Sequence, residues 1–453
     1  MLLHSELRSC QPLTAPRFPP VGMPPRKALS PRPVSSISTL PMAGRWFHLR
    51  ATRCPYSTRA SVLETVIAGH ARKPVFSTSA TCASPFQTLS SLFFSHITHY
   101  FLHRVQHRFS GAGATALLLQ CTPASILTLP PLHSTLSTLL HPNTGGIVDD
   151  CIITRLGPEL FYVVTNAGCR AKDLAYLRDN ISLLSSSSTH QTNTKLDWEV
   201  LSDWGLVALQ GPLSVSILES MLANQDPTNN LKDLLFGQCR FITVRLSDGS
   251  VPIPILVSRG GYTGEDGFEI SLPPHLTQSF TESMLQKATP DRLRLAGLGA
   301  RDSLRLEAGM CLYGHDLNDS ITPVEAGLSW IIGKDRRAGG GFHGADVILR
   351  QLKPVKDGGA GVTKRRVGLV IEGAPAREGA SIVDKATGES VGSVTSGCPS
   401  PTAGLNIAMG YVKTGWHKAG TEVEVLVRGK KRVGIVRKMP FVETKYWKGT
   451  APS

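Results

Sequence analysis

The last ninety or so residues constrain the fold most strongly, because they consist almost entirely of short apolar strands. Five runs rich in β-branched and apolar residues follow one another closely: 366–371, 390–395, 407–412, 422–427 and 432–436. The last two are separated only by Arg428-Gly-Lys-Lys431, which predicts a hairpin. Strands of this length and spacing are typical of a small β-barrel or sandwich. We therefore predict a separate C-terminal domain, a β-barrel or a sandwich, over 365–447, joined by a Gly- and Lys-rich linker over 353–364.

The region before that linker alternates between helical and strand patterns. Strands are expected at 134–140, 147–155, 160–165, 204–210, 239–246, 254–259 and 269–272, the second and third forming a hairpin. Helices are expected at 114–119, 170–183, 213–222 and 298–308, the last ended by Gly309, and a surface loop at 185–194. This mixture predicts an α+β region over 104–352.

Positive charge is concentrated at the front of the chain. Residues 1–148 contain 13 Lys or Arg and only two acids, Glu6 and Glu64, so most of the net charge of +14 lies there. The rest is nearly neutral, which disfavours a nucleic-acid-binding protein. The first 60 residues contain eight arginines and one acid, the composition of a mitochondrial transit peptide. We predict a disordered targeting segment over 1–60 rather than an ordinary basic tail.

Residues 61–103 show no periodicity that we can assign to a domain. The stretch 57–104 is acid-poor, unpatterned and scattered with His, so we interpret it as the product of a frameshift or a translated intron. No apolar run is long enough to span a membrane. The nine cysteines include no Cys-x-x-Cys pair, which disfavours a disulfide framework or a structural zinc site and fits a reducing compartment.

Two adjacent carboxylates, Asp149 and Asp150, lie in an apolar strand just after a Gly-Gly turn. Adjacent strand residues point to opposite faces, so at most one of them can face a site. Burying a carboxylate costs several kcal/mol unless it is paired or hydrogen-bonded. Either one Asp faces solvent while the other accepts hydrogen bonds from turn amides, or one of them belongs to a functional site.

Glu269 follows a loop in which four glycines let the backbone turn tightly or approach a ligand. The spacing of these glycines is not that of a phosphate-binding loop. A carboxylate can accept two parallel N–H bonds. Glu269 is therefore either a ligand-binding group or a surface residue at the start of a strand.

Arg301 and Arg305 are four residues apart on one predicted helix and share a face. A planar guanidinium suits a carboxylate ligand or a structural ion pair equally well. Asp302, Glu307 and Glu325 are available as structural partners, and we interpret Arg305 as structural.

Six motifs follow one another in fixed order: Asn143-Thr-Gly-Gly-Ile-Val-Asp-Asp150, Arg259-Gly-Gly-Tyr-Thr-Gly-Glu-Asp-Gly-Phe-Glu269, Leu298-Gly-Ala-Arg-Asp-Ser-Leu-Arg-Leu-Glu-Ala-Gly309, Thr322-Pro-Val-Glu-Ala-Gly-Leu-Ser-Trp330, Thr395-Ser-Gly-Cys-Pro-Ser-Pro401 and Lys438-Met-Pro-Phe-Val442. Together they resemble the aminomethyltransferase, or T-protein, of the glycine cleavage system. Six motifs in order make coincidence a poor explanation. The resemblance extends from about Arg104 to Trp447. It implies a multi-domain α+β fold with a folate-binding region at 104–352 and a C-terminal β-barrel.

That family moves a one-carbon unit from the aminomethyl-lipoyl group of H-protein to tetrahydrofolate and releases ammonia. The resemblance makes Asp150 the catalytic carboxylate and assigns Glu269, Arg301, Tyr446 and Asn166 to substrate binding. It implies tetrahydrofolate as co-substrate, with no metal and no nucleotide cofactor. The implied partners are lipoylated H-protein and the other glycine cleavage components, not nucleic acid or a membrane, and the implied location is the mitochondrial matrix.

A second interpretation belongs to another functional class. Before residue 104 we find none of the segments that family members use to complete the first domain. The chain could then be a catalytically impaired folate-binding or carrier-docking module. Tetrahydrofolate binding without turnover would favour this alternative.

Overall fold

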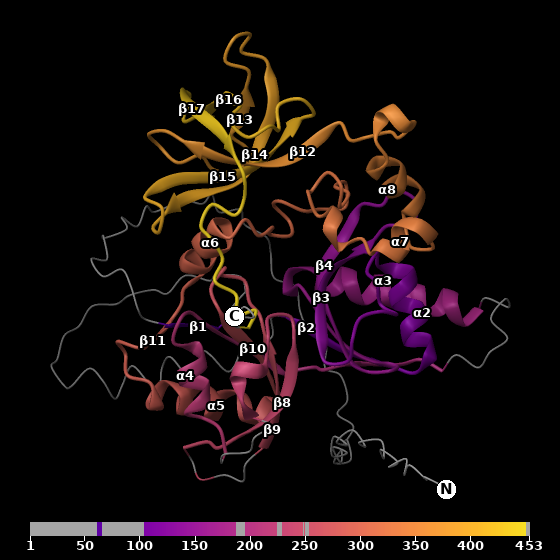
Figure 1. Ribbon diagram of the computed structural model, residues 1–453, viewed down its shortest axis with the longest axis vertical. Helices are drawn as coiled ribbons and strands as arrows, with labels where there is room; N and C mark the ends of the chain where they lie inside the picture. Colours follow the sequence, from indigo (N-terminus) through magenta and orange to yellow (C-terminus); the bar gives the residue numbers. More distant parts are fainter. Residues whose placement is uncertain are drawn as a thin grey trace, which may run out of the picture. The chain divides into compact units, whose positions relative to one another are not determined.

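The computed structural model describes residues 61–65, 104–186, 195–223, 229–247, 249 and 253–449, all within one compact unit, Thr58–Ser453. The predictions for 1–60 and 66–103 lie outside these residues. Two β-sheets, the helices that pack on them and a closed barrel make up the described fold (Figure 1). The predicted α+β class with a C-terminal β-barrel is confirmed.

The first sheet has the strand order β3-β4-β5-β2-β6. Its strands are β2 (Val105–Ser110), β3 (His133–Leu140), β4 (Ile147–Gly157), β5 (Leu160–Thr165) and β6 (Asp197–Val200). Two helices, α2 (Ala112–Cys121) and α3 (Arg170–Ser186), pack apolar side chains on one face and form a shared core with Phe109 and Phe161. The predicted β4–β5 hairpin is confirmed. The loop predicted at 185–194 is wrong for its first two residues, because α3 continues through Ser186.

The second sheet has the order β11-β1-β7-β10-β9-β8. Its strands are β1 (Ser61–Thr65), β7 (Gly205–Gln210), β8 (Cys239–Val244), β9 (Ile253–Arg259), β10 (Gly267–Leu272) and β11 (Leu293–Leu295). Helices α4 (Ser214–Glu219) and α5 (Pro274–Lys287) contribute side chains to its core. Helix α4 is shorter than the predicted helix at 213–222.

Strand β1 lies in a stretch to which we had assigned no element. It pairs in parallel with β11 and antiparallel with β7, and so fills a position between two other strands of the sheet. A five-residue strand is too short to show periodicity. Its place is set by the backbone edge of β7, which no local pattern reveals.

A helical segment leads from the second sheet to the barrel. Helix α6 (Leu298–Glu307) ends before Gly309, which has φ +71°, as the predicted helix stop requires. A Cβ at this position would lie 2.8 Å from that of Met439, so a side chain here would clash. Helices α7 (Lys334–Gly339) and α8 (Ala345–Leu352) follow, and the predicted linker contains one short helical turn, Val355–Asp357. None of the described helices is both long and apolar enough to cross a membrane.

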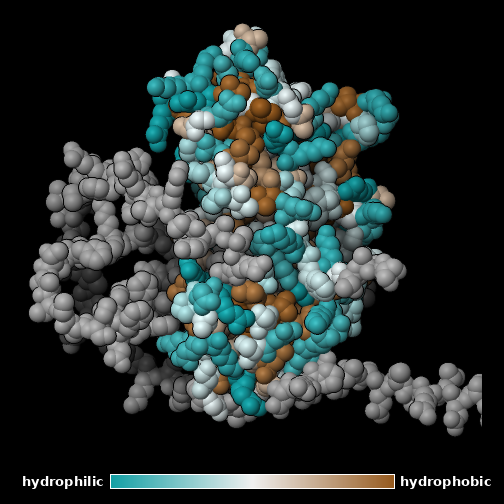
Figure 2. Space-filling view, turned by 60° about the vertical axis from the view of Figure 1, so that its left-hand side comes forward, coloured by the Kyte–Doolittle hydropathy of each residue, from teal (hydrophilic) through white to brown (hydrophobic). Residues whose placement is uncertain are grey.

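Six strands close the C-terminal barrel in the order β12-β15-β14-β13-β16-β17. They are β12 (Lys364–Ile371), β13 (Ser381–Val383), β14 (Ser390–Ser400), β15 (Leu405–Lys413), β16 (Glu422–Val427) and β17 (Lys430–Arg437). Figure 2 shows apolar residues on this part of the molecule bordered by hydrophilic ones. The final hairpin is confirmed, although β17 begins two residues earlier than predicted, because Arg428 and Gly429 make the turn with positive φ.

Arg305 joins α6 to the barrel. Its guanidinium is 2% exposed and forms ion pairs with Asp302 at 2.8 Å and Asp316 at 2.7 Å, while Nη2 donates to Ser396 of β14 at 2.9 Å. Its structural interpretation therefore agrees with the contacts. Asp316, its fully buried partner, was not among the partners we had named.

Replacing Arg305 by Leu is expected to destabilise the protein by about 3–5 kcal/mol, because Asp316 would stay buried without its cation. Chemical unfolding of the purified variant measures this change. Asp302→Ala is the matched control, since that carboxylate is 43% exposed and its loss should cost about 1 kcal/mol or less. Equal losses in the two variants would contradict the assignment of Asp316 as the critical partner.

Candidate active site

One cavity of about 810 Å³ lies where the two sheets, α6, residues 308–330 and the C-terminal segment meet. All five residues that the resemblance assigned to catalysis or binding line this cavity: Asp150, Asn166, Glu269, Arg301 and Tyr446. They come from β4, the residue after β5, β10, α6 and the segment after β17. Their sequence positions span about three hundred residues, so their convergence is a property of the tertiary structure.

Strand β4 sends its two aspartates to opposite faces, as predicted. Asp150 lines the cavity, whereas Asp149 is fully buried behind it. Neither is the freely solvated Asp of our first alternative. Asn166 holds both: its backbone N–H and its Nδ2 donate to Asp149 at 2.8 and 2.9 Å, and Nδ2 also donates to Asp150 Oδ1 at 2.8 Å.

The environment of Asp150 favours its neutral form more than water does. Burial, reinforced by the negative charge of Asp149, raises the pKa of Asp150 to about 7. The positive charge of Arg104 and the hydrogen bond from Asn166 oppose this rise. Asp150 can therefore exist as carboxylate or acid near neutral pH, as an acid–base group requires.

Glu269 points into the cavity from the middle of β10. Its strand neighbours are Ala208 of β7 and Ser258 of β9, so it is not the exposed residue at a strand start that we had considered. Its side chain is 15% exposed and lies 4.0 Å from the guanidinium of Arg104. The positive charge of Arg104 therefore attracts the carboxyl groups of both Glu269 and Asp150. We had not predicted it as a site residue, because it immediately precedes β2 and no motif marks it.

Arg301 and Arg305 diverge despite their shared helix. The guanidinium of Arg301 lies over the ring of Tyr262, 4.7 Å from its centroid, and both residues line the cavity. The Tyr262 hydroxyl donates to the backbone carbonyl of Cys311. Tyr262 lies within the glycine-containing motif before Glu269, which is the signal by which it could have been found.

The C-terminal segment brings an aromatic group to the cavity. Tyr446 stacks on Phe236 with ring centroids 4.1 Å apart. The segment is held by a hydrogen bond from the Phe236 N–H to the Trp447 carbonyl at 2.8 Å and another from Trp447 Nε1 to the Lys232 carbonyl at 2.9 Å. Burial raises the pKa of Tyr446 to about 12, so its hydroxyl remains a neutral donor. An aromatic pair at this position could pack on a planar ligand.

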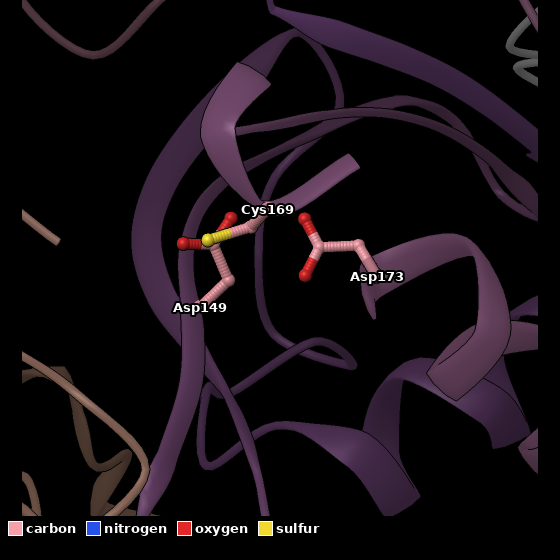
Figure 3. Close-up of side chains that lie close together, drawn as sticks. All are labelled: Asp149, Cys169 and Asp173. Carbon is pink, nitrogen blue, oxygen red and sulfur yellow. The ribbon is translucent and has the colours of Figure 1, made fainter. Parts of the chain in front are cut away.

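A cluster of potential metal ligands lies behind the cavity wall. The side-chain donor atoms of Asp149, Cys169 and Asp173 are all within 4.8 Å of one another (Figure 3). Two hard carboxylates and one soft thiol do not match the common ligand preference of a single metal. Burial also raises the pKa of the Cys169 thiol well above its usual range, which disfavours the thiolate that metals bind. Sequence reasoning did not find this cluster.

The chain matches a known class of protein with two characteristic domains. Residues 102–336 match the GCVT N-terminal domain, and residues 364–443 match the glycine cleavage T-protein C-terminal barrel domain. The crystal structure of glycine cleavage system aminomethyltransferase T from Bartonella henselae superposes with a TM-score of 0.65 at 34% identity, covering 77% of this chain and 86% of that one.

Sequence relatives point to the same family. A probable mitochondrial aminomethyltransferase from Schizosaccharomyces pombe is 45% identical over 347 residues, 76% of this chain and 81% of that protein. A mitochondrial aminomethyltransferase from Dictyostelium discoideum is also 45% identical, over 76% of this chain and 82% of its own length. This chain therefore belongs to the aminomethyltransferase family, the T-proteins of the glycine cleavage system, and the resemblance seen in the motifs is confirmed.

The raised pKa of Asp150 predicts a specific pH dependence of stability. Because the folded pKa lies above the unfolded value, stability is lost as pH rises from about 4 to about 7. The Asp150→Asn variant lacks this loss, so its stability relative to the wild type should grow by at most about 1.4 kcal/mol per pH unit across that window. Urea unfolding at several pH values checks it, and a pH-independent difference would contradict the prediction.

Proposed function

We propose that this chain is an active aminomethyltransferase of the glycine cleavage system. It transfers the methylene carbon of an aminomethyl-lipoyl group, carried by H-protein, to tetrahydrofolate. The carbon–sulfur and carbon–nitrogen bonds of the aminomethyl group break while its carbon bonds to N5 and N10 of tetrahydrofolate. The two protons lost from these nitrogens leave on ammonia and on the lipoyl thiol, and 5,10-methylenetetrahydrofolate forms. The observation that carries the proposal is the convergence of the five predicted site residues on one cavity, with Asp150 in its wall.

The cavity has the chemistry to bind a folate. Its volume of about 810 Å³ lies in the range of small-molecule sites. We assign Glu269 to the two parallel N–H donors of the pterin edge, a geometry that a carboxylate accepts well. Arg301 is assigned to the carboxylate end of the ligand, and Tyr446, stacked on Phe236, to its aromatic middle.

Asp150 is assigned to the folate amine that attacks the methylene carbon. A carboxylate there stabilises the positive charge that develops on nitrogen and can accept its proton. Asn166 fixes the carboxylate orientation through its bond to Oδ1. Holding both reactants in one cavity contributes further, because well-oriented groups can gain roughly 7–11 kcal/mol in effective molarity.

The partner and location follow from the same assignment. The lipoyl arm must reach the cavity from outside, so lipoylated H-protein is the proposed partner, alongside the other glycine cleavage components. Relatives are named mitochondrial, and we propose the mitochondrial matrix as the location. Exposed lysines and arginines of the folded region would steer an acidic carrier to the cavity mouth.

The alternative is a module that binds folate or the carrier without catalysis. Both interpretations predict tetrahydrofolate binding, so turnover decides between them. The hydrogen bond from Asn166 to Asp150 and the raised pKa of Asp150 favour the enzyme.

Asp150→Asn is expected to lower turnover by about 10²–10⁴-fold and to leave tetrahydrofolate binding largely intact, because the amide cannot accept the proton. Ammonia release with aminomethyl-loaded H-protein measures turnover, and calorimetry measures binding. Asp179→Asn, at an exposed position on α3, is the control. Unchanged turnover in Asp150→Asn would refute the assigned role.

Glu269→Gln is expected to weaken tetrahydrofolate binding by about 10–100-fold, since hydrogen bonds to a charged group contribute roughly 1.5–3 kcal/mol. Calorimetric titration of the full chain measures this directly. Glu219→Gln, at an exposed position on α4, should bind like the wild type. If the affinities of both variants match, Glu269 does not contact the pterin.

A further inference from the structure

Three carboxyl groups form a series that runs inward from the cavity wall. Asp150 lines the cavity, Asp149 lies behind it on β4, and Asp173 of α3 lies within reach of Asp149. Asp149 and Asp173 are both 0% exposed. Figure 3 shows the Asp173 carboxyl group directed toward Asp149 and Cys169. Two buried carboxyl groups at this distance cannot both carry a full negative charge without compensation.

The two buried groups differ in their hydrogen bonding. Asp149 accepts two hydrogen bonds from Asn166, one on each oxygen, at 2.8 and 2.9 Å. Among the described residues, neither oxygen of Asp173 accepts a hydrogen bond of normal distance and angle, although the Thr165 hydroxyl lies nearby. Hydrogen bonds from fixed donors favour the anion. The charge therefore belongs on Asp149 and the compensating group on Asp173.

Among the described residues, no cation forms an ion pair with Asp149 or Asp173. The Lys172 ammonium is directed instead to Asp319, at 3.2 Å from both carboxylate oxygens, and to the Tyr313 hydroxyl. It is part of a half-exposed surface group, not of the buried cluster. A proton on Asp173 would both neutralise that residue and provide a donor for Asp149.

We propose that Asp149 and Asp173 share one proton, carried by Asp173, and that this neutral carboxyl group fixes Asp149 as the acceptor that orients Asn166 toward Asp150. Asp173 and Asp149 are positioning residues in this arrangement, since neither lines the cavity. The part that concerns catalysis rests on the proposed function of Asp150. The existence of the proton does not.

The electrostatics of the cluster agree with its geometry. Burial, the negative charge of Asp149 and the closeness of that carboxylate raise the pKa of Asp173 to about 9. The nearby Thr165 hydroxyl and the charge of Lys172 lower it, but by less.

Apart from Asp150 and Lys172, the titratable groups around the cluster are neutral at pH 7. They are Cys151 on β4, Cys169 in the turn just before α3 and Tyr313 in the loop after α6, and burial raises the pKa of each. Each of these groups keeps its own proton near neutral pH, so none of them takes up the proton shared by Asp149 and Asp173. Asp149 thus remains the charged acceptor of the group.

The shared proton has two consequences for the cavity. It holds Asp149 in place, so that the Asn166 amide can bond both Asp149 and Asp150 Oδ1. It also keeps a second negative charge away from Asp150, whose pKa the Asp149 charge already raises. Loss of the proton donor would release Asp149 and Asn166, remove the Asn166 hydrogen bond that lowers the Asp150 pKa, and so move the acid limb of the activity profile to higher pH.

The proton can be detected without any assay of activity. At pH 8, where Asp150 is mostly ionised, infrared difference spectra of the full chain in D₂O should show a carboxylic-acid carbonyl band. This band should be missing from Asp173→Asn and present in Asp179→Asn, a control at an exposed position on the same helix. Its absence from the wild type would overturn the proposal.

The pH dependence of unfolding gives a second readout. Since the folded pKa of Asp173 lies above the unfolded one, wild-type stability is lost as pH rises from about 4 to about 9. Asparagine keeps a donor without needing the proton. The urea midpoint of unfolding of Asp173→Asn should therefore exceed that of the wild type by an amount that grows up to about pH 9. The corresponding difference for Asp150→Asn should level off at about pH 7. A pH-independent difference would overturn the proposal.

A comparison of two substitutions tests the positioning role. Asp173→Ala should shift the acid limb of turnover upward by one-half to one pH unit, on the order of a several-fold change in proton affinity, and Asp173→Asn should return it toward the wild-type position. Equal shifts in the two variants would indicate packing alone and overturn the role. If Asp173→Ala does not fold, the infrared and unfolding tests on Asp173→Asn still decide.

A metal ion is the competing means of compensation. Elemental analysis of the purified full chain, before and after incubation with excess Zn²⁺, would reveal stoichiometric metal that Asp173→Asn lacks; that result would overturn the shared proton. Failure of the proposed function would give a different pattern. Turnover would be unchanged in Asp150→Asn, while the carboxylic-acid band of the wild type would still be present.

Discussion

Arg305 holds together the parts of the molecule that surround the cavity. Its guanidinium reaches Asp302 on its own helix, the fully buried Asp316 in the following loop and Ser396 on barrel strand β14. Asp316 in turn accepts from the Leu312 N–H at 3.0 Å. The loop between Met310 and Leu317 contributes several cavity-lining residues. The wall of the cavity is therefore positioned by a charged pair whose burial is tolerable only while both partners are present.

On the other side of the cavity, burial again acts on charged groups, but these groups are carboxyl groups rather than a cation paired with an anion. Around Asp150 the described residues include two further buried carboxyl groups, Asp149 and Asp173, and burial raises the pKa of Asp150 and Asp173. Arg104 and Asn166 oppose this rise at Asp150, so its pKa settles near neutrality. The buried acidic cluster thus sets the protonation state of Asp150, whereas the buried ion pair of Arg305 and Asp316 fixes the position of the cavity wall.

Much of the fold was predictable because it depends on local patterns. The β4–β5 hairpin, α3 and the barrel strands follow from apolar periodicity and turn residues, and Gly309 marks the end of α6 because it alone tolerates that backbone angle. Strand β1 and the short β13 were missed, since three to five residues carry too little pattern and their pairing depends on distant strand edges. The site motifs identified Asp150 and Glu269, whereas Arg104 and Asp173 lie outside every motif.

The sequence by itself determined the family, the α+β class and the identity of five candidate site residues, because motifs and periodicity are properties of neighbouring residues. The tertiary structure decided that these five line one cavity, that Arg301 faces it while Arg305 is buried in ion pairs, and that Asp150 faces it while Asp149 is buried behind it. It also brought Asp173 to Asp149. Burial and the approach of charges from distant elements set a residue's protonation and partners, and neither quantity is encoded in the residues beside it.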